Sequence, residues 1–115
     1  MKESRGEGID VSPEAIATLA AQAATGVEGV AATYRKPVES ITSRMKREFV
    51  HKGVRVEREG ESCRLTLYLK VEYGVNLPAM AREVKGRVKE YVEGLTDIRV
   101  DEVEVVIEDI EPPPA

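Results

Sequence analysis

The chain has 115 residues, of which 33% are charged, and a formal net charge of −4 at pH 7. A single domain of this length buries about two-thirds of its unfolded surface, so its core needs no disulfide or metal. The negative charge excludes the overall electrostatic footprint of a nucleic-acid binder, and no window approaches the ~20 apolar residues of a membrane span.

Residue usage also bears on the compartment. The first eight residues lack the apolar stretch of a signal peptide, and the single cysteine, Cys63, is in register with Leu65 and is expected in the core. A lone buried thiol fits a reducing compartment, so we expect a cytoplasmic protein with at most peripheral membrane contact. Gln22 and Asn76 are the only amide side chains, whereas 33% of the residues are charged. This balance is typical of heat-adapted proteins, so a thermophilic origin is our hypothesis.

The first element expected is a helix that begins at Ser12-Pro13-Glu14. Serine is a good N-cap, proline fits the first helical position, and an acid is favourable in the first turn. Apolar residues then recur at helical spacing as far as Gly26, and they are Ile16, Leu19, Ala20, Ala23 and Ala24. Residues 27–32 predict a short first strand.

Residues 35–52 differ in composition from the rest of the chain. Val38, Ile41, Met45 and Phe49 form an apolar stripe with basic residues around it, which predicts a basic amphipathic helix or a mobile version of one. Such a segment can bind RNA, an anionic membrane or an acidic protein surface, or it can simply remain solvated. The candidate interaction residues are Arg44, Lys46, Arg47, Phe49 and Lys52.

Two strands, 54–58 and 63–73, are predicted to form a hairpin through the turn at 59–62. In the second strand one face carries Cys63, Leu65, Leu67, Leu69, Val71 and Tyr73, and the other carries polar residues and Tyr68. One face of the sheet is therefore expected to be dry and the other wet, with helices on the dry face only.

A second main helix and a last strand complete the chain. Asn76 is a suitable N-cap and Pro78 suits the first turn, and the apolar face contains Met80, Ala81, Val84, Val88, Tyr91, Val92 and Leu95. The last strand follows Asp97, and its apolar phase shifts across Asp101 and Glu102, which predicts a bulge.

The order of elements is helix, strand, strand, strand, helix, strand, plus the optional basic helix. It predicts an α+β two-layer sandwich, with a small mixed sheet of about four strands and two main helices on one face.

Five blocks of the sequence occur in a familiar order. They are Ile9-Asp10-Val11-Ser12-Pro13-Glu14-Ala15-Ile16, Gly26-Val27-Glu28-Gly29-Val30, Lys52-Gly53-Val54, Val71-Glu72-Tyr73-Gly74-Val75-Asn76-Leu77-Pro78 and Val100-Asp101-Glu102-Val103-Glu104-Val105. The blocks resemble the alkaline shock protein family of envelope stress proteins. Their extent implies one domain over residues 1–115, with an ordered core at about 8–110, a variable basic segment at 35–52 and a proline-rich tail at 111–115.

The resemblance also carries expectations about function. It implies a small cytosolic, non-enzymatic protein, mainly of Gram-positive bacteria, tied to envelope stress or homeostasis. Some members of the family self-assemble and are held at the membrane by a separate anchor protein. The family brings no catalytic residues.

The residues themselves offer little chemistry. His51 is the only histidine and is expected in a loop, which gives a catalytic triad little support. No Cys-x-x-Cys pair or glycine-rich phosphate motif is present, and the acidic C-terminal stretch lacks the spacing of a calcium loop. Gly26-Val27-Glu28-Gly29 matches the G-x-x-G of KH domains, but it is expected to end a helix and start a strand. We therefore expect no catalytic residue, cofactor or metal.

Charge is distributed unevenly along the chain. Residues 35–58 are net basic, whereas 101–111 carry only acidic charges, so the basic segment of one molecule can meet the acidic strand of another. Such head-to-tail contacts build open assemblies. The leading hypothesis is a homo-oligomeric scaffold or adaptor that a membrane-anchored protein partner recruits, without direct membrane insertion. The alternative is a small RNA-binding module that uses residues 35–52.

Overall fold

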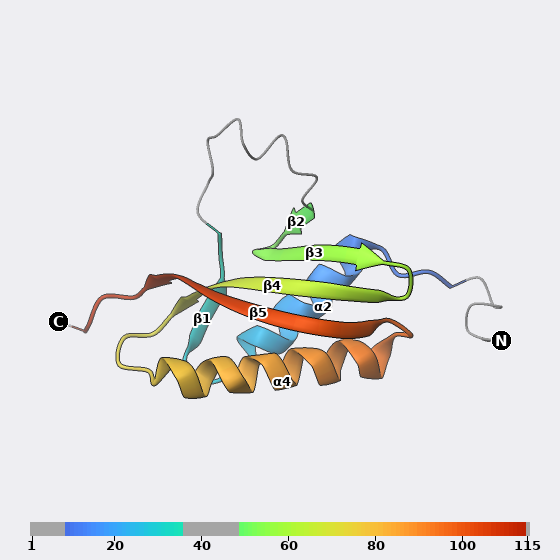
Figure 1. Ribbon diagram of the computed structural model, residues 1–115. Helices are drawn as coiled ribbons and strands as arrows, with labels where there is room; N and C mark the ends of the chain where they lie inside the picture. Colours follow the sequence, from blue (N-terminus) through green and yellow to red (C-terminus); the bar gives the residue numbers. More distant parts are fainter. Residues whose placement is uncertain (1–8, 36–48, 115) are drawn as a thin grey trace.

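The structure is a computed structural model that describes residues 9–35 and 49–114 (Figure 1). Its elements are α2 (Pro13–Thr25), β1 (Val30–Thr33), β2 (Phe49–His51), β3 (Val54–Glu59), β4 (Ser62–Val71), α4 (Leu77–Leu95) and β5 (Arg99–Ile110). The described strands form one mixed five-stranded sheet, which confirms the predicted α+β class.

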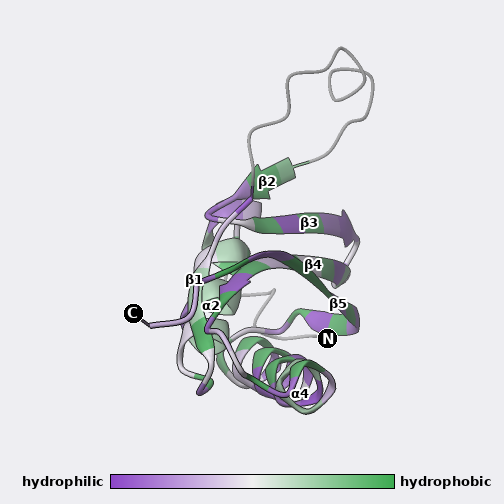
Figure 2. Cartoon of the chain, turned by 90° about the vertical axis from the view of Figure 1, so that its left-hand side faces the viewer, coloured by the Kyte–Doolittle hydropathy of each residue, from purple (hydrophilic) through white to green (hydrophobic). Residues whose placement is uncertain are grey.

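The long strand β4 organises the sheet. On one side it pairs in parallel with β5 over Ser62–Val71. On the other side it pairs antiparallel with two strands in succession, first β3 and then β1. Strand β2 continues the sheet beyond β3, so the order across it is β5, β4, β3, β2 (Figure 2).

The core lies between β4 and the two helices. The predicted alternation directs Cys63, Leu65, Leu67, Leu69 and Val71 to one face, where all five side chains are buried. Fully burying an aliphatic side chain of this size contributes about 1.5–3 kcal/mol. The helices complete the core with Ile16, Ala17, Ala20, Ala24, Met80, Val84, Val88 and Val92.

Both predicted helix starts are confirmed by their caps. The Ser12 hydroxyl accepts a hydrogen bond from the Ala15 N–H at 3.1 Å, and the Asn76 side-chain oxygen accepts one from the Ala79 N–H at 3.0 Å. Such caps are worth about 1 kcal/mol each. They fix the first turns of α2 and α4, which cover the same face of the sheet.

The two glycines of the G-x-x-G motif have structural roles. Gly26 caps α2 through its N–H, which reaches the Ala23 carbonyl at 3.2 Å. Gly29 has a φ of 100° and lies so close to Val75 that an added Cβ would be 2.8 Å from a methyl carbon. The motif therefore ends a helix and leads into β1, as expected.

The basic segment is partly a strand instead of a helix. Phe49–His51 form β2, and the residues that follow, Lys52 and Gly53, have φ angles of 53° and 75°. Two successive positive φ angles make the type I′ turn that closes a tight hairpin, so β2 pairs with β3, and His51 lies in a strand instead of a loop. Residues 36–48 of the segment lie outside the described residues.

Several boundaries also differ from the prediction. Strand β1 begins at Val30, after a turn, and β4 ends at Val71, which leaves Tyr73 exposed. Tyr91 and Leu95 of α4 are exposed as well, because the buried positions of this helix repeat every four residues and form a narrow stripe. The predicted bulge is confirmed, since the partner of β4 moves from Val100 to Glu102.

The buried thiol of Cys63 gives a simple test of the core. Burial raises the pKa of Cys63 to about 11, so the thiol is neutral at pH 7. We expect the native protein to leave a thiol reagent such as Ellman's reagent unreacted, and one equivalent to react after unfolding in guanidinium. Rapid labelling of the native protein would contradict this burial.

Candidate functional site

The described residues offer a surface and not a metal centre. Among residues 9–35 and 49–114, no three histidine, cysteine, aspartate or glutamate side chains are grouped so that they could hold a metal ion. None of the described helices has the length and apolar character needed to cross a bilayer. The strongest chemical feature of this part of the chain is the charge on β5.

Strand β5 is acidic and lies at an edge of the sheet. In its 12 residues Arg99 is the only base, and the acids are Asp101, Glu102, Glu104, Glu108 and Asp109. The register places Glu102 and Glu104 on the face away from the helices, beside Arg64 and Thr66 of β4. Arg64 and Glu102 form an exposed ion pair at 3.5 Å, which is worth at most about 1 kcal/mol.

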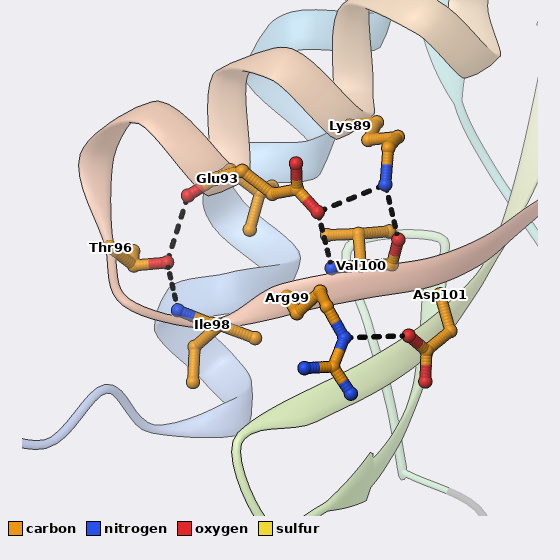
Figure 3. A network of polar contacts seen from close by, with 8 residues as sticks. Lys89, Glu93, Thr96, Ile98, Arg99, Val100 and Asp101 are labelled. Carbon is orange, nitrogen blue, oxygen red and sulfur yellow. Dashed lines mark hydrogen bonds and ion pairs between the residues drawn. The ribbon is translucent and has the colours of Figure 1, made fainter.

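Two side chains of α4 hold the start of β5 (Figure 3). The Val100 N–H donates to a carboxylate oxygen of Glu93 at 2.8 Å, and the Lys89 ammonium donates to the Val100 carbonyl at 2.8 Å. Lys89 and Glu93 also pair with each other at 3.0 Å. Because the N–H and C=O of a strand residue point to the same side, α4 closes the outer edge of β5 at this residue.

These contacts make the stability sensitive to acid. The Val100 N–H, and then Lys89, lower the pKa of Glu93 below its usual value of 4.5. Arg99 lowers the pKa of Asp101 in the same way. A carboxyl group whose pKa is lower in the folded than in the unfolded protein stabilises the fold at pH values above its unfolded pKa. This contribution is lost as the pH falls through the folded pKa.

Replacing Glu93 with glutamine is therefore expected to weaken this acid sensitivity. At pH 7 the variant should lose about 1 kcal/mol, since a charge-assisted bond to Val100 becomes a neutral one. Between about pH 6 and pH 3 it should lose less stability than the wild type. Urea unfolding at pH 7, pH 6 and pH 3 measures the free energy of unfolding of the wild type and the variant. Glu90→Gln, on the same helix, is the control. Identical pH profiles for the wild type and the Glu93 variant would contradict the assignment.

The face of the sheet away from the helices is not uniformly wet. Thr66 and Tyr68 are buried there, because arginine side chains lie over them. The Arg55 guanidinium donates to the Thr66 hydroxyl at 3.2 Å, and the Arg35 guanidinium lies 4.7 Å from the centre of the Tyr68 ring. The expectation that this face is wet is therefore wrong at Thr66 and Tyr68, which are buried. The Tyr68 ring contacts an arginine of the same chain.

The two predicted interaction residues that the structure describes, Phe49 and Lys52, lie away from the acidic strand β5. Arg44, Lys46 and Arg47 lie outside the described residues. Phe49 is half-buried in β2 and packs against the core, whereas Lys52 is exposed in the turn that follows. β2 and β5 occupy opposite edges of the sheet, so the described part of the basic segment does not meet the acidic strand within one molecule.

Sequence reasoning missed the role of Lys89 and Glu93. Their spacing of four residues on a helix was visible, but this spacing is also that of an ordinary exposed ion pair. Nothing local in the sequence indicates that both side chains reach the Val100 backbone.

Comparisons with known proteins agree with the fold and with the sequence blocks. The chain matches the model of the alkaline shock protein 23 family, described as having a cell envelope-related function, over residues 1–112. The uncharacterized protein YloU of Bacillus subtilis is 30% identical over 104 residues, which cover 89% of this chain and 87% of YloU. YqhY of the same organism is 25% identical over 99 residues, covering 86% and 73% of the two chains.

Solved structures with a similar fold include forms of the MamM CTD. A copper form has a TM-score of 0.54 at 18% identity and covers 88% of this chain and 100% of its own. A zinc form has a TM-score of 0.51 at 16% identity and covers 96% of this chain and 91% of its own. At these identities the likeness shows the fold alone.

Proposed function

The chain belongs to the alkaline shock protein 23 family, which has a cell envelope-related function, and we propose that it acts there as a non-enzymatic scaffold or adaptor. In this role the protein associates with itself in the cytoplasm, and a membrane-anchored partner protein recruits it to the envelope.

The observation that supports this proposal most directly is the separation of charge. Residues 35–58 contain eight basic and three acidic residues, whereas 101–111 contain six acids and no base. Strand β2 belongs to the first region and β5 contains most of the second, and these two strands lie at opposite edges of the sheet. The basic residues that flank β2 in the sequence, Arg44, Lys46, Arg47 and Lys52, and the acids of β5 favour a head-to-tail contact, which is heterologous and repeats from one copy to the next.

The described chemistry supports a role without catalysis. The Cys63 thiol is buried and neutral at pH 7, so it is a poor nucleophile. The only histidine, His51, has its ring 6.2 Å from that of Phe49 and lies in β2. The Phe49 side chain has no polar atom, so this contact is not the hydrogen bond that orients a catalytic imidazole.

Light scattering after size exclusion tests the self-association. We expect the wild type to form particles larger than a monomer at low salt and to dissociate as salt rises, because exposed charges are screened. A variant in which Arg44, Lys46 and Arg47 are all changed to glutamate should remain monomeric. The matched control makes the same change at Arg82, Lys85 and Arg87 of α4 and should assemble. A monomeric wild type at every concentration, or an unaffected triple variant, would overturn the proposal.

The same runs separate the scaffold from the alternative RNA-binding function of residues 35–52. The chain has four tyrosines and no tryptophan, so bound nucleic acid would dominate the absorbance at 260 nm. Recruitment through a partner predicts that the pure protein does not float with anionic lipid vesicles. Flotation without any partner would show that the protein binds the membrane directly.

A further inference from the structure

We propose that the outer edge of β5 accepts an extended basic strand from a second copy of the chain, so that neighbouring molecules share one continuous sheet. This inference rests on the proposed function, because it names the contact through which the copies associate. The occupant is residues 43–48 of the second copy, immediately before its β2.

The backbone groups of β4 point alternately to the strands on its two sides. The Tyr68 N–H donates to the Gly53 carbonyl at 2.9 Å, and the Tyr68 carbonyl accepts from the Tyr34 N–H at 2.7 Å. Tyr68 therefore bonds toward β3 and β1. Because successive residues of a strand point their backbone groups to opposite sides, the residues on either side of it, Leu67 and Leu69, bond toward β5.

The register then fixes the outward groups of β5. In a parallel ladder, the residue opposite a bonding residue turns its own N–H and C=O to the far side. Val100, opposite Cys63, follows this rule, since its groups reach α4 instead of β4. The next β5 residues with the same phase are Val103, Val105 and Ile107, opposite Leu65, Leu67 and Leu69.

These three residues form an open stretch of edge. Pairing with β4 is regular from Glu102 to Ile107, between irregularities on either side. Figure 1 shows α4 and β5 diverging from the turn that joins them, and the Lys89 and Glu93 side chains close the edge only at Val100. No other described residue bonds the outward groups of this stretch. An edge of this kind is a template for strand addition.

Charge selects the strand that can be added. Glu102 and Glu104 are two residues apart on one face of β5. A second β5 would place acids beside these acids, which is destabilising. Arg44 and Lys46 have the same spacing of two, so an extended segment 43–48 carries both on one face, beside the two glutamates. Since β2 and β5 lie at opposite edges, each molecule offers one strand and one edge, and the sheet grows head to tail.

Replacing Val105 with proline tests the backbone contact separately from charge. The N–H of Val105 points outward, so proline removes no hydrogen bond to β4, and proline is tolerated on edge strands. The control, Val105→Ala, keeps the N–H. In sedimentation experiments at matched concentration, we expect the alanine variant to assemble like the wild type. The proline variant should associate about tenfold more weakly or worse, because it lacks one backbone donor and adds bulk at the edge.

A mixing experiment makes the proposal independent of how well the proline variant folds. Glu102→Lys/Glu104→Lys and Arg44→Glu/Lys46→Glu should each stay monomeric alone and form complexes when mixed, because the reversed charges then match. Amide hydrogen exchange at Val103, Val105 and Ile107 should slow in these complexes. Assembly of a folded proline variant at wild-type strength, or fast exchange at these amides in the assembly, would overturn strand addition and leave the scaffold proposal standing. A wild type that never assembles would overturn both.

Discussion

Replacing Gly53 with alanine is expected to lower the free energy of unfolding by about 3 kcal/mol, because a side chain there meets backbone atoms that cannot rotate away. An added Cβ would lie 2.6 Å from the Tyr34 nitrogen and 2.8 Å from the Thr33 carbonyl carbon. Gly53 stands where β1 and β3 meet along one edge of β4, and its carbonyl accepts the Tyr68 N–H at 2.9 Å. Any shift that relieves the clash also strains this junction.

The matched control for this substitution is Gly60→Ala. Gly60 has a similar positive φ of 63°, but an added Cβ there meets nothing within 4 Å. The control should therefore lose only the cost of the backbone conformation, about 1 kcal/mol. Guanidinium unfolding followed by circular dichroism measures both variants. Equal losses would show that the positive φ, and not the approach of β1, explains the need for glycine at position 53.

The junction at Gly53 also shows where sequence reasoning reaches its limit. The alternation of β4 and the caps at Ser12 and Asn76 depend on neighbouring residues, so the main helices and the long strand could be predicted. The close approach of Gly53 to Thr33 depends on residues 20 positions apart. Strand β2 was predicted as part of a helix for a similar reason. Its pairing depends on the turn at Lys52 and Gly53, and its apolar residues fit a helical stripe equally well.

The candidate surface was predictable to a similar degree. The acidity of β5 is a property of composition and appears directly in the sequence. Its position at an edge follows from pairing, and the closure of Val100 by Lys89 and Glu93 follows from how a helix lies against that edge. Periodicity also cannot predict that Arg35 covers Tyr68, because long side chains choose among many rotamers once the strands are in place.

Replacing Arg58 with alanine is expected to cost about 2 kcal/mol, because this side chain joins parts of the chain that are far apart in sequence. The guanidinium donates to the Val11 carbonyl at 2.7 Å and to the Gly60 carbonyl at 3.0 Å, and it lies 3.7 Å from the Asp10 carboxylate. It also lines a pocket of about 290 Å³ with Ile9, Asp10, Val11, Gly94, Leu95, Thr96, Asp97 and Ile98. Removing it leaves the Val11 carbonyl without its donor and enlarges the pocket.

Two further variants separate this bridge from the general effect of losing a surface charge. Arg64→Ala removes an arginine whose exposed ion pair with Glu102 is worth at most about 1 kcal/mol, so it should change stability little. Arg58→Lys keeps the charge but reaches only one carbonyl well, and should recover part of the loss. Urea unfolding measures the free energy of unfolding of the three variants. Equal losses for Arg58→Ala and Arg64→Ala would mean that charge, and not the link from β3 to the start of α2, stabilises this end of the molecule.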